Sequence, residues 1–228
     1  MNGKSLSPNR MKMIGTFAKR ANSLKSAILL VGPTGSGKTP LGDFLEKYGL
    51  AGRRCVHFDF GSNMRRIGKK TKRPFFLSMP EFLTVRNVLK TGSLLKEKEY
   101  SIAGKILSEF VRRKRILPGD LLILNGLPRH IAQAEALDFF LKVIMVVNLR
   151  CRAGVVLSRI IHNSGGDRAG RVDDSLLLVK KKLRIYRSRT LPLLDHYRRK
   201  RVKVVNVVVT VETSPKDIVN IIRPMKAG

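Results

Sequence analysis

Acidic side chains are scarce in this sequence of 228 residues, and tryptophan is absent. Only 16 Asp and Glu residues oppose 46 Lys and Arg residues, which leaves a formal charge of +30. An excess of this size predicts non-specific binding to polyanions such as RNA or DNA at low salt. The basic residues are spread over the whole chain, however, with few aromatic side chains among them to stack on bases. We therefore interpret the charge as a compositional bias and not as the signature of a nucleic-acid-binding protein.

Cysteines are also rare, and long apolar runs are missing. Cys55 and Cys151 each stand alone, without the spacing of a metal site, which favours two unreactive thiols in a reducing compartment. No apolar run reaches the length of a transmembrane helix, so we expect no membrane association. The apolar share of 43% is sufficient for one α/β domain with small insertions.

The first 26 residues contain no Asp or Glu, but several Lys, Arg and Ser residues. This composition suits a transit peptide to an organelle matrix. The same basic bias runs through the rest of the chain, so we interpret residues 1–26 as a basic N-terminal extension of a cytoplasmic protein. Residues 27–228 are then expected to form the functional domain.

The segment from residue 27 to residue 39 carries the strongest motif. A short apolar run leads into Gly-x-x-x-x-Gly-Lys-Thr, the spelling of a phosphate-binding loop. We expect its glycines to adopt positive φ, so that consecutive N–H groups face one anion at the positive end of the following helix. Lys38 is predicted to reach the β- and γ-phosphates, and the Thr39 hydroxyl to ligate Mg²⁺. The predicted site for ATP comprises Gly32, Pro33, Thr34, Gly35, Ser36, Gly37, Lys38 and Thr39.

Short apolar segments alternate with helical patterns along the chain. Besides the strand before the loop, we expect strands at 55–58, 121–124, 143–147 and 202–209. We expect helices at 41–48, 61–66, 78–90, 100–114, 131–140, 153–161, 173–199 with a bend at Pro192, and 215–222. The alternation predicts an α/β P-loop NTPase fold, a five-stranded parallel sheet with helices on both faces. The stretches at about 60–95 and 160–172 lie outside the sheet and are expected to be mobile flaps over the site.

A second motif, Asn-Gly-Leu-Pro-Arg at residues 125–129, closes the third strand, and Gln133 follows. In this segment the chain resembles the adenylate kinases, nucleoside-monophosphate kinases that carry Asp-Gly-Phe-Pro-Arg and then Gln at this spacing. The resemblance covers nearly all of residues 27–222. Other family motifs are matched in the right order by Gly61 with Arg65, by Lys90-x-Gly92-x-Leu94-Leu95, by Arg171-Val172-Asp173-Asp174 and by Thr190-x-Pro192-Leu193.

The resemblance implies the reaction ATP + AMP ⇌ 2 ADP, by direct in-line transfer with Mg²⁺ carried by ATP. Positioning and charge neutralisation would supply the rate. By the same resemblance, Arg65 and Arg129 hold the acceptor phosphate as bidentate donors, and Gln133 reads adenine. Arg159, which also belongs to the ATP site, and Arg171 close over the transferred phosphoryl group. The implied catalytic residues are Lys38, Arg129, Arg159 and Arg171.

The implied acceptor site lies on the insertion at about 60–95 and on the segments that face it. The second insertion, at 160–172, is too short to hold a four-cysteine cluster, so it resembles the short-lid form without structural zinc. By the resemblance we expect a monomer that binds ATP and AMP. The implied acceptor residues are Phe60, Gly61, Arg65, Leu95, Gly126, Arg129, Gln133, Arg171 and Lys182.

The chain departs from the family in two acidic positions. Asn125 stands where the family has Asp, and Ser62 replaces the Asp of Thr-Gly-Asp, in which Phe60 also replaces Thr. Asn125 can still contact Mg²⁺ through a water molecule, without supplying charge, and Asp59 is the nearest other carboxylate. Three hypotheses remain open: an adenylate kinase, a kinase acting on UMP, CMP or another nucleoside monophosphate, and a nucleotide-binding pseudokinase associated with RNA.

Overall fold

One parallel sheet organises the chain. The computed structural model describes residues 25–96, 99–138, 140–167 and 175–223. Its five strands follow the order β2–β3–β1–β4–β5, which confirms the predicted α/β P-loop NTPase fold. The strands are β1 (Lys25–Val31), β2 (Cys55–Asp59), β3 (Leu121–Asn125), β4 (Leu141–Arg150) and β5 (Lys203–Val208). The predicted N-terminal extension, residues 1–26, lies outside the described residues except for its last two, which begin β1.

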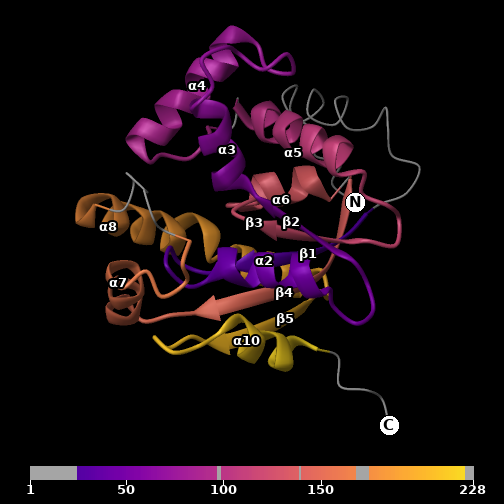
Figure 1. The fold of residues 1–228 in the computed structure, drawn as a ribbon, viewed down its shortest axis with the longest axis vertical. Coiled ribbons are helices and arrows are strands. Elements are labelled where there is room, and N and C mark those ends of the chain that lie inside the picture. The colour runs from indigo at the N-terminus through magenta and orange to yellow at the C-terminus, as the bar shows by residue number, and fades with distance from the viewer. Residues whose placement is uncertain (1–24, 97–98, 139, 168–174, 224–228) are drawn as a thin grey trace.

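Helices cover both faces of the sheet because the central strands are apolar on both sides (Figure 1). In β1, Ile28 and Leu30 pack into one core with α2 and α10, whereas Ala27, Leu29 and Val31 face the opposite core with α5, α6 and α9. This alternation follows the period of two in a strand. The helices named here are α2 (Lys38–Tyr48), α5 (Tyr100–Lys114), α6 (Ile131–Leu137), α9 (Leu193–Arg199) and α10 (Pro215–Ile222).

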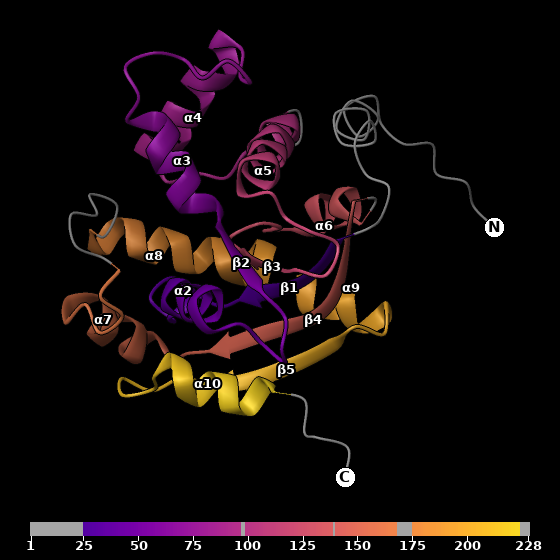
Figure 2. The same ribbon diagram turned by 45° about the vertical axis from the view of Figure 1, so that its right-hand side comes forward.

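A helical excursion follows β2 directly. α3 (Phe60–Gly68) and α4 (Met79–Thr91) lie side by side, away from the sheet (Figure 2). Asp59 caps α3, since its carboxylate accepts the N–H of Ser62 at 2.7 Å. Ser78 forms a capping box with Glu81 at the start of α4. This excursion forms one wall above the carboxyl ends of the strands.

The helix predicted for residues 173–199 keeps a helical backbone over its described part, but it does not run as one uninterrupted α-helix. α8 (Leu176–Ile185) gives way to a π-helical turn (Tyr186–Thr190), and α9 starts after Pro192. Pro192 has no N–H for the helical ladder, and the N–H of Leu191 instead reaches back five residues to Tyr186 at 2.9 Å. The break therefore precedes the proline and does not form a simple bend at it.

Two smaller differences concern the ends of elements. α6 ends at Leu137, three residues before the predicted end, because the chain must turn before β4 begins at Leu141. β4 is longer than predicted and runs to Arg150. α7 (Ala153–Ile161) occupies its expected place. The remaining strands and helices agree with the predicted ranges to within three residues.

Candidate functional site

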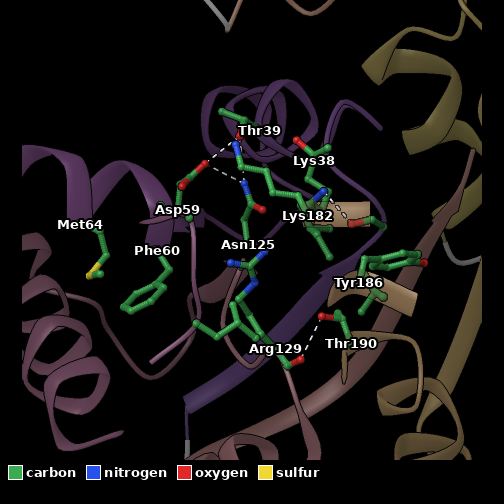
Figure 3. A pocket seen from close by; sticks show the side chains of 18 of the residues that line it. Lys38, Thr39, Asp59, Phe60, Met64, Asn125, Arg129, Lys182, Tyr186 and Thr190 are labelled. Carbon is green, nitrogen blue, oxygen red and sulfur yellow. Dashed lines mark hydrogen bonds between the residues drawn. The ribbon is translucent and has the colours of Figure 1, made fainter. Parts of the chain in front are cut away.

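A cavity of about 200 Å³ opens at the carboxyl ends of β1, β2 and β3 (Figure 3). Open α/β sheets bind ligands at this edge. Its walls come from the loop after β1, from α3 and α4, from the segment after β3, and from α8 with the π-helical turn. The cavity therefore lies between the phosphate-binding motif and the helical excursion.

The loop before α2 has the geometry of an anion-binding nest. Gly35 and Gly37 have φ of 76° and 88°, as predicted, so their conformation favours glycine. Gly32 does not share this conformation, and the prediction of a positive φ there is wrong. It is instead required by space, because an added Cβ would lie 2.6 Å from Ser36 Oγ and 2.9 Å from the carbonyl oxygen of Leu149.

Lys38 lies over this loop. Its ammonium group donates to the carbonyl oxygens of Gly32 at 2.8 Å and Pro33 at 2.6 Å. These contacts hold the positive charge at the mouth of the nest, beside the N-terminus of α2, where phosphate oxygens can accept from the same group. Most of the predicted ATP residues line the cavity: Gly32, Thr34, Gly35, Gly37, Lys38 and Thr39. Pro33 lies beside a second cavity, and Ser36 is fully buried under the loop.

Three polar side chains meet beside the loop. The Thr39 hydroxyl and the Asn125 amide nitrogen both donate to Asp59 Oδ2, at 2.7 and 2.8 Å (Figure 3). The Asn125 amide also lies 3.1 Å from Thr39 Oγ1. Asp59 and Asn125 are paired in the register of β2 and β3, so these two side chains lie next to each other at the ends of adjacent strands. The prediction named Asp59 only as the nearest other carboxylate; its place at the end of a strand was a further signal.

These oxygen groups suit a magnesium ion that arrives with a nucleotide. Mg²⁺ prefers carboxylate, hydroxyl and phosphate oxygens, and it keeps several of its water molecules. Within the described ranges, no cluster of three or more His, Cys, Asp or Glu side chains is placed to hold a metal ion. Thr39 and Asp59 are placed so that they could contribute to a magnesium site together with the phosphate oxygens of a nucleotide.

Arg129 is clamped by its backbone on both sides. Its N–H donates to Gln133 Oε1 at 2.8 Å, and its carbonyl accepts the Thr190 hydroxyl at 2.9 Å. The side chain points from the segment after β3 toward Asn125 (Figure 3). Burial lowers the pKa of the Arg129 guanidinium, and the charge of Asp59 opposes that shift. A guanidinium still keeps its charge at neutral pH, so the cavity holds a cation suited to a phosphate.

The remaining acceptor candidates gather around this cation. Phe60, Gly61, Arg65, Leu95, Gly126, Gln133 and Lys182 all line the cavity. Gly61 lies close beneath Arg65, since a Cβ there would meet the guanidinium at 3.2 Å. Arg171 lies outside the described residues. The cavity thus joins the predicted ATP loop to nearly the whole predicted acceptor set.

Arg159 has a different environment from the other arginines. It is buried, and its Nη1 donates to the carbonyl oxygens of Thr210 at 2.7 Å and Val211 at 2.9 Å. Its Nη2 lies behind the loop, near Gly37. Arg159 does not line the cavity. Its contacts connect α7 to the segment after β5 and to the back of the phosphate loop.

Several lining residues were missed by sequence analysis. Met64, Val88 and Leu89 form an apolar wall, and Tyr186 faces the cavity from the π-helical turn. Met64 follows Phe60 by four residues on α3, and this helical spacing was a usable signal. The position of Tyr186 had no such signal, because it depends on the interruption between α8 and α9. An apolar wall opposite cationic groups suits a ligand with a flat base and a phosphate.

The two cysteines agree with the expectation of unreactive thiols. Burial raises the pKa of Cys55 to about 11 and also raises that of Cys151. Both are unpaired.

In the described part of the chain, no helix is both long and apolar enough to cross a membrane.

Comparison with known proteins identifies relatives of one kind. The adenylate kinase of Phocaeicola vulgatus is 31% identical over 179 residues, covering 75% of this chain and 84% of the relative. That of Prochlorococcus marinus strain MIT 9313 is 27% identical over 181 residues, covering 77% and 86%. That of Nitrobacter winogradskyi is 26% identical over 206 residues, covering 86% and 92%. No family model matches the chain.

Proposed function

The chain belongs to the adenylate kinase family, and on this premise we propose that it transfers the γ-phosphoryl group of ATP to AMP. The family makes it a nucleoside-monophosphate kinase; the choice of AMP is the finer part of the proposal. One observation carries it: a phosphate loop and a set of acceptor-type cations line the same cavity. A protein that only bound ATP would have no need for the second set.

On the donor side, the loop N–H groups and Lys38 bind the β- and γ-phosphates. The N-terminus of α2 adds its positive dipole end beneath them. Thr39 and Asp59 are the residues that would hold Mg²⁺ together with phosphate oxygens. When bound, Mg²⁺ neutralises charge on the phosphoryl group in transfer. Arg159 supports the loop from behind.

On the acceptor side, Arg129 and Arg65 bind the phosphate of the monophosphate. Within the described residues, neither guanidinium forms a hydrogen bond or ion pair, so both are available to a ligand. Planar donors orient the acceptor oxygen toward the γ-phosphorus, and that oxyanion needs no general base. Phe60 and Met64 provide the wall against which the base packs.

The two insertions have separate roles in the proposed phosphoryl transfer. We propose that residues 60–95 bind the acceptor and that residues 160–172 form a short lid without structural zinc, from which Arg171 closes over the transferred group. Excluding water from the closed site would favour transfer to the nucleotide over hydrolysis. The protein is proposed to act as a monomer.

A second candidate acceptor follows from the orientation of Gln133. Its amide oxygen already accepts from the N–H of Arg129, which leaves the amide nitrogen as the group that can face a base. A lone donor pairs with a ring nitrogen of adenine but also with the acceptor groups of a pyrimidine. This observation supports a kinase acting on UMP or CMP as the alternative.

A coupled assay with ATP and each of AMP, UMP, CMP and GMP tests the proposal. We expect AMP to be the fastest acceptor, with two ADP formed for each AMP consumed. Faster turnover with UMP or CMP would replace the acceptor and keep the reaction. Turnover with none of the four, beside measurable binding of ATP, would overturn the kinase and support the nucleotide-binding pseudokinase.

A further inference from the structure

We propose that Asp59 is the carboxylate that anchors the magnesium ion of bound ATP, one strand away from the position of Asn125. The inference rests on the proposed ATP site and names a residue that the family motif does not assign. The motif has its acid at the end of β3, where this chain has the neutral Asn125. The nearest carboxylate stands at the corresponding end of β2.

The first support is the position of the Asp59 carboxylate. Its Oδ2 accepts the hydroxyl hydrogen of Thr39 at 2.7 Å, and Thr39 is the loop residue expected beside a nucleotide-bound magnesium ion. If the hydroxyl turned its hydrogen away from Asp59, a cation between the two groups would find two oxygen ligands already next to each other. Asp59 also lines the cavity, and its negative charge opposes the effect of burial, which lowers the pKa of Arg129.

The second support is the way in which the carboxylate is held. Oδ1 is fixed by the N–H of Ser62 at the start of α3, and Oδ2 by the amide of Asn125 at 2.8 Å. A carboxylate accepts only, so the Asn125 group that faces it must be the NH₂. Asn125 thus acts as a positioning residue: it orients the neighbouring acid by a donated hydrogen bond.

Asn125 is itself supported from below by a buried histidine. His57 Nδ1 lies 2.8 Å from Asp43 Oδ1, and this acceptor requires the proton on Nδ1. In the neutral ring this tautomer leaves His57 Nε2 as an acceptor, and Nε2 lies 3.5 Å from the Asn125 amide nitrogen. Gly42 leaves room for the ring, since a Cβ there would lie 2.3 Å from it. The amide is therefore held in the orientation that serves Asp59.

The test is the effect of Mg²⁺ on ATP affinity, measured by titration calorimetry in Mg²⁺ and in EDTA without an acceptor nucleotide. A carboxylate beside the phosphates repels metal-free ATP and attracts the complex with Mg²⁺. We expect Asp59→Asn to lower the ratio of the two affinities by about tenfold or more. The substitution keeps an acceptor for the Ser62 N–H, so α3 should remain capped.

A swap and a control sharpen the result. Asp59→Asn combined with Asn125→Asp returns the acid to the end of β3, with an amide at position 59 able to donate to it, and should restore the preference for Mg²⁺. Glu46→Gln removes an equal charge from α2, where Glu46 pairs with Lys114 outside the cavity, and should leave the ratio unchanged.

The outcomes separate this inference from the proposed function. An Asp59→Asn protein that folds, binds ATP and keeps the wild-type ratio would overturn the role of Asp59 and leave the kinase untouched. A wild-type protein that binds no ATP with or without Mg²⁺ would overturn both. Failure of phosphoryl transfer has no influence on these binding measurements, because no acceptor is present.

Discussion

Strands β2 and β3 carry polar side chains at both of their ends, and the two ends are built in opposite ways. At the amino ends, Arg54 and Asp120 precede the strands and form an ion pair of 3.0 Å. At the carboxyl ends stand Asp59 and Asn125, which face the cavity. We call the network at the amino ends closed, because its polar groups contact one another within the protein. We call the network at the carboxyl ends open, because it faces the cavity.

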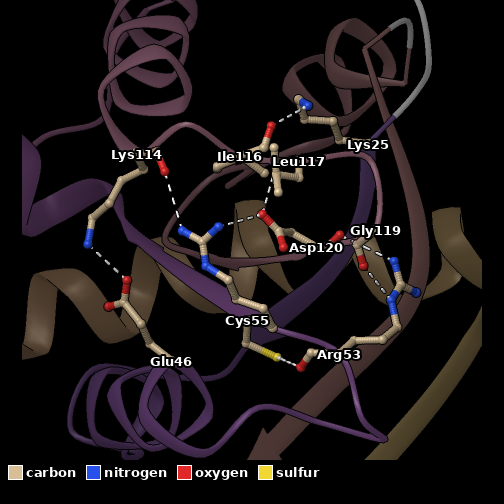
Figure 4. A network of polar contacts seen from close by, with 10 residues as sticks. Lys25, Glu46, Arg53, Cys55, Lys114, Ile116, Leu117, Gly119 and Asp120 are labelled. Carbon is tan, nitrogen blue, oxygen red and sulfur yellow. Dashed lines mark hydrogen bonds and ion pairs between the residues drawn. The ribbon is translucent and has the colours of Figure 1, made fainter.

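The closed network satisfies its charges within the protein. Asp120 Oδ2 also accepts the N–H of Leu117 at 2.7 Å, and Arg53 donates to the carbonyl oxygens of Gly119 and Asp120 at 2.9 and 3.2 Å (Figure 4). Lys25 adds a bond of 2.8 Å to the carbonyl of Ile116. These contacts tie the starts of β1, β2 and β3 together, so their expected effect is on stability.

The open network leaves cations directed at a cavity. Arg65 and Arg129 line it, and burial lowers the pKa of Arg129, which indicates that its charge is held at a cost. An arriving phosphate would remove this cost. The comparison teaches that paired charges at one end support the sheet, whereas uncompensated charges at the other end prepare it for an anion.

The largest effect is expected for Lys38→Ala at the open end. Loss of the ammonium group removes charge stabilisation from the transferring phosphates, and turnover should fall by roughly 10³-fold or more. The melting temperature should change little, because Lys38 is only part-buried. Steady-state kinetics and a thermal melt measure the two quantities, and retained turnover would contradict the assignment of the phosphate loop.

Arg129→Lys is expected to have the next largest effect. A lysine keeps the charge but loses the bidentate geometry, so kcat/KM for the acceptor should fall by roughly 10²-fold with little change in ATP affinity. Arg53→Lys is the matched change at the closed end. It should leave the kinetics unchanged and lower the free energy of unfolding by about 1 kcal/mol. Equal kinetic losses in both variants would erase the contrast between the ends.

Asp120→Asn tests the closed end directly. The substitution removes the partner of Arg54 and weakens the acceptor for the Leu117 N–H, so the free energy of unfolding should fall by about 1–3 kcal/mol. Kinetic constants should remain those of the wild type. Urea denaturation beside the coupled assay provides both values; a variant with full stability and impaired turnover would reverse the assignment of the two ends.

The smallest effect concerns the pH dependence of stability beside Arg129. Burial, together with the charges of Arg189 and Arg129, lowers the pKa of His130 to about 4. The unfolded chain binds this proton near pH 6.5, so the unfolded state binds more protons between pH 6.5 and 4 and stability falls as the pH falls through this window. His130→Gln should remove about 1 kcal/mol of this loss, since solvent screens the half-buried ring. Unfolding curves at pH 7 and pH 4.5 measure it, and parallel losses in both proteins would count against the shift.

Local patterns predicted most of the fold and much of the candidate site. The run before Gly32 and the runs that became β3 and β4 are apolar on both faces, and such runs are typical of covered parallel strands. The ends of α4 lie within one residue of the predicted range, because helix caps depend on a few neighbouring residues, here Ser78 and Gly92. The glycine-rich loop before α2 was recognised for the same reason, and Gly35 and Gly37 have the positive φ that the motif predicts.

The errors arose where distant segments meet. Position 32 requires a glycine because a Cβ there would clash with the carbonyl oxygen of Leu149. The two residues lie more than a hundred positions apart, so the local sequence does not reveal this contact. The π-helical turn between α8 and α9 brings the Thr190 hydroxyl to the carbonyl oxygen of Arg129. This hydrogen bond stabilises a turn that the local sequence alone disfavours. In both cases, packing against another part of the chain decided the local geometry.

What the amino-acid order determined by itself was the kind of sheet, its helices and the glycine-rich loop before α2, because turn geometry and burial period act over a few residues. Only the tertiary structure decided which acid stands beside that loop. Asp59 reaches Thr39 and Asn125 through the pairing of β2 with β3, strands joined by a long connection. Register between distant strands comes from packing of the whole sheet, so the position of Asp59 at the end of a strand did not by itself specify these two contacts.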